Sequence, residues 1–194
     1  MKITLSRIDL FSPDYRKISR LYKTAFPADE RAPMWVLTMK SGRENVDFWG
    51  LYADGKWIGL AYVLTEGGAS YLFYLAISES CRGKGFGSKA LQALKMKYAD
   101  KRLFLALEQL DESADNYEER LKRRQFYLKN GLKPINCTIR EASVVYDVMG
   151  TDDVKPEEYE TMMRNYLGKR VARLVSMQRG APAGIVTPKV SNKL

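Results

Sequence analysis

The sequence predicts an α+β fold in which helices cover both faces of a mixed β-sheet, a three-layer α/β arrangement. Two strand-like runs, 46–53 and 56–65, are joined by an Asp-Gly pair, which is a strong hairpin signal. An unbroken apolar run at 71–77 then leads through a glycine-rich loop into a helical pattern. A second buried run, 103–107, follows that helix. A strand reached through a crossover helix should lie parallel to the strand before it.

The segments before the hairpin predict one strand and two helices. Residues 2–10 alternate loosely and indicate a first strand. A Ser-Pro-Asp start at residue 12 and a Phe-Pro stop at residue 26 enclose a first helix. A short second helix is expected over 34–40. These elements precede the central strands in the chain.

The C-terminal half predicts a helix at 117–129, ended by Asn130-Gly131 at a left-handed position. A closing hairpin is expected from 134–140 and 143–149, followed by an amphipathic helix at 155–167. The complete prediction is a sheet of about seven strands.

Charge divides the chain into a domain at 1–167 and a basic, partly flexible tail at 168–194. The net charge is +9, and the tail carries six basic residues and no acid, so the domain holds +3 (26 basic minus 23 acidic). A protein that binds nucleic acid usually has a basic body. Solubilising charge is the simpler interpretation of this tail, and a nucleic-acid partner is not expected.

Composition excludes several chemistries. The chain has no histidine and only two cysteines, so zinc, Ser-His and Cys-His sites are not expected, and no metal is predicted. It shows no secretory leader pattern and no apolar run of membrane-spanning length, so we expect no membrane partner and a cytoplasmic protein.

The loop Arg82-Gly-Lys-Gly-Phe-Gly87 opens the helix that follows the central strand. Unpaired amides at a helix start, with two added cations, suit a phosphate. The spacing fits neither a Walker loop nor a dinucleotide fingerprint. It matches Arg/Gln-x-x-Gly-x-Gly/Ala, the acetyl-CoA pyrophosphate loop of the GNAT superfamily of N-acetyltransferases, which the chain resembles.

A second motif strengthens the resemblance. Phe126-Tyr127 and Gly131-Leu132 match a Phe-Tyr-x-x-x-Gly-Phe-like segment of these enzymes, with leucine replacing the last phenylalanine. The resemblance covers about residues 20–150. The stretch from residue 107 to the Arg123-Arg124 helix is similar to an uncharacterised bacterial subgroup of the superfamily.

The resemblance implies a GNAT-like acyl-CoA N-acyltransferase fold, with splayed strands 4 and 5, and acetyl-CoA as the acetyl donor. It places the pantetheine arm between those strands and the diphosphate in the glycine loop. The residues implied to bind the coenzyme are Leu75, Ala76, Ile77, Arg82, Gly83, Lys84, Gly85, Phe86, Gly87, Ser88, Asn116 and Tyr127.

The resemblance also implies direct transfer to an amine in a ternary complex, with Tyr127 protonating the departing thiolate. With no histidine present, we predict Glu108 as general base, acting through a water. Glu30 and Trp35 are candidates for acceptor binding, and the alternatives for them are a loop carboxylate and a core tryptophan.

The predicted function is an N-acetyltransferase acting on a primary amine of a small molecule or peptide. Two alternatives remain: a non-catalytic acyl-CoA-binding sensor or partner module with the same fold, and a basic RNA-associated protein. Proteins of this fold often pair through edge strands or the C-terminal hairpin, so a homodimer is compatible with the sequence. The acceptor's identity is open.

Overall fold

The computed structural model describes residues 2–28, 31–142 and 144–180. Predicted and observed elements agree closely, and the helix at 117–129 has the predicted bounds. The elements in chain order are β1 (Ile3–Arg7), α1 (Tyr15–Ala25), α2 (Met34–Lys40), β2 (Val46–Ala53), β3 (Lys56–Glu66), β4 (Ala69–Ile77), η1 (Glu79–Cys81), α3 (Phe86–Lys97), β5 (Arg102–Glu108), α4 (Tyr117–Lys129), β6 (Lys133–Glu141), β7 (Val144–Gly150), α5 (Pro156–Leu167), η2 (Val171–Leu174) and β8 (Val175–Arg179).

All the strands form one mixed sheet in the order β1-β2-β3-β4-β5-β7-β6-β8. Every neighbouring pair is antiparallel except β4 and β5, which are parallel. The predicted α+β class and its parallel pair are confirmed. Within the described residues the sheet has eight strands, one more than the sequence suggested. The additional strand is β8, which lies within the range predicted to be tail and pairs with β6. A flexible tail remains a prediction for 181–194, which lie outside the described residues.

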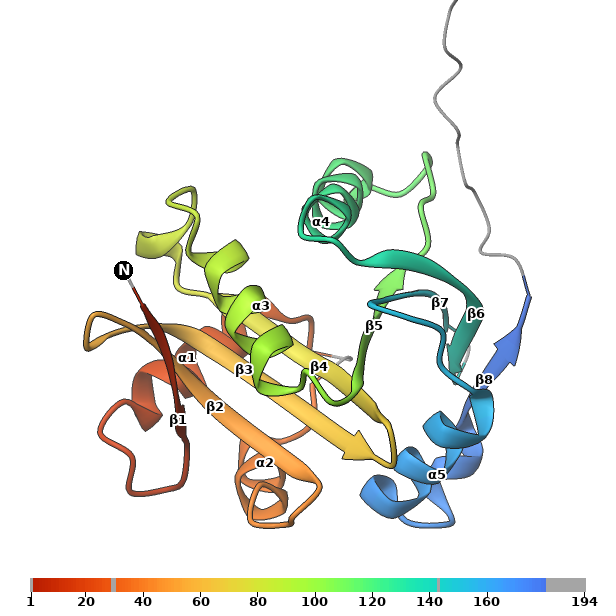
Figure 1. The fold of residues 1–194 in the computed structure, drawn as a ribbon, viewed down its shortest axis with the longest axis horizontal. Coiled ribbons are helices and arrows are strands. Elements are labelled where there is room, and N and C mark those ends of the chain that lie inside the picture. Colours follow the sequence, from red (N-terminus) through yellow and green to blue (C-terminus); the bar gives the residue numbers. More distant parts are fainter. Residues whose placement is uncertain (1, 29–30, 143, 181–194) are drawn as a thin grey trace, which may run out of the picture.

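Helices cover both faces of the sheet, as predicted (Figure 1). Buried side chains of α1, α2 and α5 belong to one hydrophobic cluster, and those of α3 and α4 belong to a second. Successive residues of β3 belong to different clusters, because the side chains of a strand point alternately to its two faces. Leu60 and Tyr62 face α1, whereas Ala61 and Val63 face α3. The glycine loop before α3 therefore lies where the chain passes from the end of β4 to the helix layer of α3 and α4.

Strands β4 and β5 are paired over a short stretch only. Their register runs from Ala69↔Arg102 to Tyr71↔Phe104 and goes no further. The rings of Tyr71 and Phe104 are stacked at this last pair, with centroids 4.8 Å apart. Further along β4, Phe73 is an extra residue in the register with β3. Such a bulge bends and twists its strand. The predicted splaying of the two strands is observed, and the bulge accounts for the bend of β4.

The last strand, β8, packs against α5 on the face of the sheet that α5 covers. Met177 of β8 is buried in the cluster that contains Tyr159 and Met163 of α5. None of the helices in the described part of the chain is long and apolar enough to cross a membrane.

Gly59 of β3 provides a test of the packing at the open end of β4. A Cβ atom built there would lie 2.3 Å from the carbonyl oxygen of Ala76. We expect Gly59→Ala to lower the free energy of unfolding by about 1–3 kcal/mol, because a backbone oxygen must move. Gly42→Ala is the control, since its nearest neighbour would be 3.8 Å away. Equal unfolding midpoints for both variants in urea would contradict this packing.

Candidate active site

The glycine loop is open on the side where a ligand would lie. Gly83 and Gly85 have φ values of +73° and +75°, in the region where residues with a Cβ atom are strained. A Cβ atom added at either position would meet no protein atom within 4 Å. The two glycines are therefore required by the backbone conformation, and the space around them is free for a bound group.

The backbone amides of this loop are unsatisfied. In the described residues, none of the N–H groups from Gly83 to Ser88 donates to a protein acceptor. The first hydrogen bond of α3 runs from Lys89 N to Gly85 O, at 3.2 Å. Successive free amides beside a left-handed residue form an anion-binding concavity, and the helix dipole adds to it. The structure thus has the donor set that a diphosphate requires.

Side chains fix the loop to the end of β4. Arg82 Nε donates to the carbonyl of Ile77 at 3.1 Å, and Lys84 Nζ donates to the carbonyl of Ser80 at 2.8 Å. On the other side, a Cβ atom at Gly87 would lie 3.3 Å from the Phe126 ring. Gly87 therefore allows α3 to approach α4 closely, which brings the loop and Tyr127 onto the same side of the sheet.

A buried ion pair anchors α4 to β7. Arg124 and Asp147 are both almost fully buried and form a short ion pair. Gln109 Nε2 also donates to Asp147, at 3.0 Å. A charge pair in such a dry environment has to be well matched, because removing one partner leaves an uncompensated charge. This pair therefore fixes where α4 lies against the sheet.

Glu108 is the centre of a second set of ion pairs. Its two carboxylate oxygens lie 2.9 Å from Arg120 Nη2 and 3.2 Å from Arg123 Nη1. Asn116 completes the group: its Oδ1 accepts from Arg120 Nε at 2.7 Å, and its Nδ2 lies 3.5 Å from Glu108. Two predicted site residues are thus brought together, but by partners that the sequence analysis did not select.

Tyr127 lies on α4 within the cluster that contains α3. Its side chain is 8% exposed, and its ring centroid lies 5.0 Å from that of Phe126. Burial raises the pKa of Tyr127 to about 12, and the nearby Arg123 charge opposes this shift. Among the described residues, none forms a hydrogen bond with the Tyr127 hydroxyl. The phenol is thus protonated at neutral pH and free to donate.

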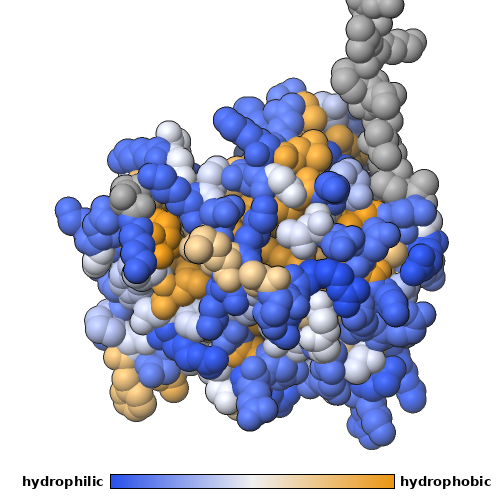
Figure 2. All heavy atoms as spheres, viewed as in Figure 1, coloured by the Kyte–Doolittle hydropathy of each residue, from blue (hydrophilic) through white to orange (hydrophobic). Residues whose placement is uncertain are grey.

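The surface between α3 and α4 is apolar. Leu75, Ile77, Phe86 and Phe126 are partly buried and pack against the second cluster, whereas the side chain of Ala76 is buried in the first cluster, on the opposite face of the sheet. Hydrophobic atoms appear there in the space-filling view, bordered by hydrophilic residues (Figure 2). The three β4 residues predicted to hold the pantetheine arm are thus next to an apolar surface and beyond the last β4–β5 pair.

Trp35, one of the two predicted acceptor residues, is not among the residues of this group. Trp35 is 64% exposed on α2, so the alternative of a core tryptophan is wrong. Glu30 lies outside the described residues. In the described ranges, no three acidic or cysteine side chains are arranged to hold a metal ion.

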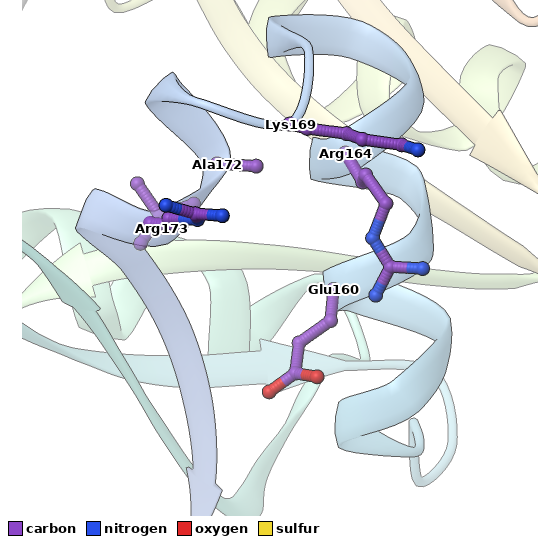
Figure 3. Close-up of a pocket in the computed structure, with 6 residues that line it drawn as sticks. Glu160, Arg164, Lys169, Ala172 and Arg173 are labelled. Carbon is purple, nitrogen blue, oxygen red and sulfur yellow. The ribbon is translucent and has the colours of Figure 1, made fainter.

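A cavity of about 440 Å³ lies away from the predicted site, between α5 and η2 (Figure 3). Arg164 and Glu160 project from α5, and Arg173 comes from the opposite wall. None of its lining residues belongs to the predicted site.

Sequence reasoning missed the ion-pair partners of α4. Arg120, Arg123 and Arg124 share the same part of that helix, and this spacing was a usable signal. Their acidic partners come from β5 and β7, at separations of 12 to 23 residues. Only the folded sheet brings those acids together.

A split parallel pair, a free amide loop and an apolar surface lie together at one end of the sheet, the arrangement that binding of an acylated nucleotide coenzyme requires. The Acetyltransferase (GNAT) family model matches residues 13–131, more than half of the chain. The chain belongs to the GNAT acetyltransferase family, and the predicted resemblance is confirmed.

Solved structures share the fold at low sequence identity. A GNAT-family protein of Bacteroides thetaiotaomicron has a TM-score of 0.65 at 18% identity, over 87% of this chain and 98% of that one. An aminoglycoside 6'-N-acetyltransferase complexed with coenzyme A has a TM-score of 0.57 at 16% identity, over 76% and 95%. The ribosomal-protein-S18-alanine N-acetyltransferase of Escherichia coli has a TM-score of 0.56 at 17% identity, over 80% and 97%. No curated protein matches the chain.

The buried pair between α4 and β7 gives a stability prediction. We expect Arg124→Met to lower the free energy of unfolding by about 3–5 kcal/mol, because Asp147 would be left buried and unpaired. Arg123→Met, on the same helix, is the control: its ion pair is partly exposed, with the arginine side chain 46% accessible, and its loss should cost about 1 kcal/mol or less. Urea unfolding measures both changes, and similar losses would show that the buried pair does not anchor α4.

Proposed function

We propose that the protein is an N-acetyltransferase that transfers the acetyl group of acetyl-CoA to the primary amine of a small molecule or peptide, by direct attack while both reactants are bound. The observation that carries this proposal is the run of free N–H groups from Gly83 to Ser88 at the start of α3. The start of any helix leaves its first N–H groups free, and here the amides of Gly83 to Gly85 extend that set.

The coenzyme would be held by two kinds of contact. The amides of 83–88 would bind the diphosphate, with Arg82 and Lys84 at the rim of the loop. Backbone groups of Leu75, Ala76 and Ile77 would hold the pantetheine arm, because this part of β4 has no partner in β5. An aminoglycoside N-acetyltransferase with this fold has been solved with coenzyme A, which supports the assignment.

Catalysis would rest on positioning. Two reactants held in line can gain effective molarities of about 10⁵–10⁸ M, without a covalent enzyme intermediate. A backbone amide among Leu75, Ala76 and Ile77, on the edge of β4 that has no partner in β5, would stabilise negative charge on the thioester oxygen. The hydroxyl of Tyr127, free of protein partners among the described residues, would donate to the departing sulfur.

The ion pairs of Glu108 suggest a role different from that of general base. Arg120 and Arg123 already occupy both carboxylate oxygens, so water or an amine would have to compete with two guanidinium groups. We infer that Glu108 chiefly positions α4 and, with it, Tyr127.

Binding of acetyl-CoA by isothermal titration calorimetry tests the cofactor site. We expect Gly85→Asp to weaken acetyl-CoA binding roughly 100- to 1,000-fold, through repulsion between the carboxylate and the diphosphate at close range. Gly67→Asp is a matched control, because Gly67 also has a positive φ, of +52°, and open space around it, but lies in the β3–β4 turn. Equal acetyl-CoA affinities for the two variants would show that the loop is not part of the coenzyme site.

The role of Tyr127 is tested by turnover. We expect Tyr127→Phe to lower kcat about 100-fold and to leave acetyl-CoA affinity within about threefold, because only a proton donor is lost. Because burial raises the pKa of Tyr127 to about 12, the wild-type donor stays protonated below that value, and kcat should show no loss from this group up to pH 10. Release of the coenzyme A thiol, followed with an amine library, measures kcat and its pH dependence. Binding of acetyl-CoA without any thiol release would favour a non-catalytic module.

The role of Glu108 is separable from that of Tyr127. We expect Glu108→Gln to lower kcat less than about tenfold, because an amide oxygen can still accept from one arginine. A general base would cost about 100-fold or more and would remove a titration from the pH profile of kcat/KM. A loss of that size with an unchanged unfolding midpoint would assign Glu108 as the base.

A further inference from the structure

The cavity between α5 and η2 has a basic lining (Figure 3). Its volume of about 440 Å³ is within the range of sites for small molecules. The lining residues are Glu160, Arg164, Lys169, Ala172, Arg173 and Val175. All of them lie beyond residues 13–131, the part of the chain that the family model matches. The cavity is therefore separate from the loop and the strands that would hold the coenzyme.

A reversal of the chain brings the two walls of the cavity together. Gly168 follows α5 with a φ of +83°, and its amide donates to the carbonyl of Arg164 at 2.9 Å. The amide of Ala172 then donates to the carbonyl of Gly168 at 3.0 Å. The chain thus folds back after α5, and η2 lies beside this helix with Lys169 and Arg173 in the cavity lining.

The wall that α5 contributes is the exposed side of this helix. Tyr159 and Met163 are buried in the core beneath it. Glu160 and Arg164 are exposed and four residues apart, so they share another side of the helix. Within the part of the chain described, no ion pair joins these two side chains, and Figure 3 shows their charged ends apart. The acid on this wall therefore does not neutralise the arginine beside it.

The cavity carries uncompensated positive charge. Among the described residues, the side chains of Arg164, Lys169 and Arg173 form no ion pair. Glu160 is the only carboxylate among the described residues that line the cavity, so the lining has a net charge of +2 (three cations minus one acid). The planar donors of the two guanidinium groups match phosphate oxygens, and the lysine adds a point charge. A ligand with two negative charges would balance the lining.

The rest of the lining is apolar. Ala172 and Val175 are half-buried and add no charge to the wall. An anion beside them would be partly shielded from water, where its attraction to the cations is stronger than in bulk solvent. The cavity thus combines converging charges with a surface that removes solvent from a bound group.

The opposite side of α5 packs where β4 and β5 separate. The ring of Tyr159 lies 5.8 Å from that of Tyr71 and 6.4 Å from that of Phe104, the last paired residues of the two strands. The ring of Tyr166 lies 6.0 Å from that of Phe73, at the bulge of β4. A ligand that connects α5 to η2 would therefore restrain the helix that covers the start of the gap, without touching the coenzyme.

We propose that the cavity between α5 and η2 binds a small phosphate-type anion with two or more negative charges, which bridges the two elements. Arg164 would hold the anion from α5, Arg173 from η2, and Lys169 from the turn between them. The inference goes beyond the proposed function and does not depend on it. Because the site lies apart from the reacting groups, its ligand acts as an effector and is not a reactant.

Binding of inorganic pyrophosphate by calorimetry is the first test. The full chain is saturated with coenzyme A, which keeps the glycine loop occupied. We expect Arg164→Gln/Arg173→Gln to weaken pyrophosphate binding at least about tenfold, because charge-assisted contacts from both walls are lost. Arg170→Gln/Arg179→Gln is the matched control, since it removes the same charge from two exposed side chains outside the lining. No binding by the wild type, or equal affinities for the two double variants, would overturn the proposal.

The acid in the lining allows a test that loss of folding cannot imitate. We expect Glu160→Gln to strengthen pyrophosphate binding about threefold or more, because a carboxylate that repels the anion is removed. Glu157→Gln is the control: Glu157 is an exposed acid of α5 outside the lining. An unchanged or weaker affinity in Glu160→Gln would show that the anion does not bind in this cavity.

A phosphate group can belong to a free small molecule or to a nucleic-acid backbone, and a second titration separates these sources. Single-stranded oligouridylate is compared with pyrophosphate at physiological ionic strength. We expect pyrophosphate to bind more tightly, because the cations converge on one cavity. Tighter binding of the oligonucleotide, lost in Arg170→Gln/Arg179→Gln, would assign the basic surface to nucleic acid and overturn the assignment of a small ligand.

Amide hydrogen exchange tests whether the ligand bridges α5 and η2. We expect saturating pyrophosphate to slow exchange of the Ala172 amide at least about threefold, because its hydrogen bond to Gly168 closes the turn between the two elements. Exchange of the Lys89 amide, at the start of α3, should not change. Slowing at Lys89 alone would place pyrophosphate in the glycine loop and overturn the proposal.

These measurements also separate this inference from the proposed function. If the wild type binds no coenzyme A, the proposed function fails, and titration of the free chain and the same variants still tests the cavity. If coenzyme A binds and pyrophosphate does not, only the effector site is excluded.

Discussion

The arrangement of the whole molecule depends on the separation of β4 from β5. Parallel strands in a sheet normally satisfy each other's backbone groups along their length, and burying unpaired groups is costly. Here the ladder ends at Tyr71↔Phe104. The stacked rings of these two residues hold the strands together where pairing ends, and the bulge at Phe73 turns β4 away. The backbone groups on the remaining edge of β4 would be paired only by a ligand with hydrogen-bonding groups that lies beside it.

The two halves of the sheet must nevertheless be held at a fixed separation. On the β5 side, the Arg124–Asp147 pair and the ion pairs of Glu108 connect α4 to the strands. Gly87 lets the start of α3 contact Phe126 across the gap. The glycine loop and Tyr127 are therefore linked by packing as well as by position. Five arginine and acid positions outside the two sequence motifs therefore support the structure of the candidate site.

Local signals in the sequence predicted most of the fold. The Asp-Gly turn, the apolar run of β4 and the Asn-Gly stop of α4 each depend on neighbouring residues only, and each is where it was expected. The strand β8 was missed because Val175–Arg179 is short and is stabilised by pairing with a distant strand. The partners of Arg124 and Glu108 were missed for the same reason: charge pairs between elements follow from topology. For Trp35 the sequence left two interpretations, acceptor binding or a place in the core, and its exposed side chain excludes the second.

The glycine loop and the cations beside it would act on an anion in different ways. The amides of 83–88 are fixed dipoles with defined directions, so they select a compact group that fits the loop and depend weakly on salt. Arg82 and Lys84 are full charges on exposed side chains, so they attract anions over a longer range, and salt screens them. The two cations would therefore bear mainly on how fast a coenzyme arrives, whereas the amides would decide which group stays bound.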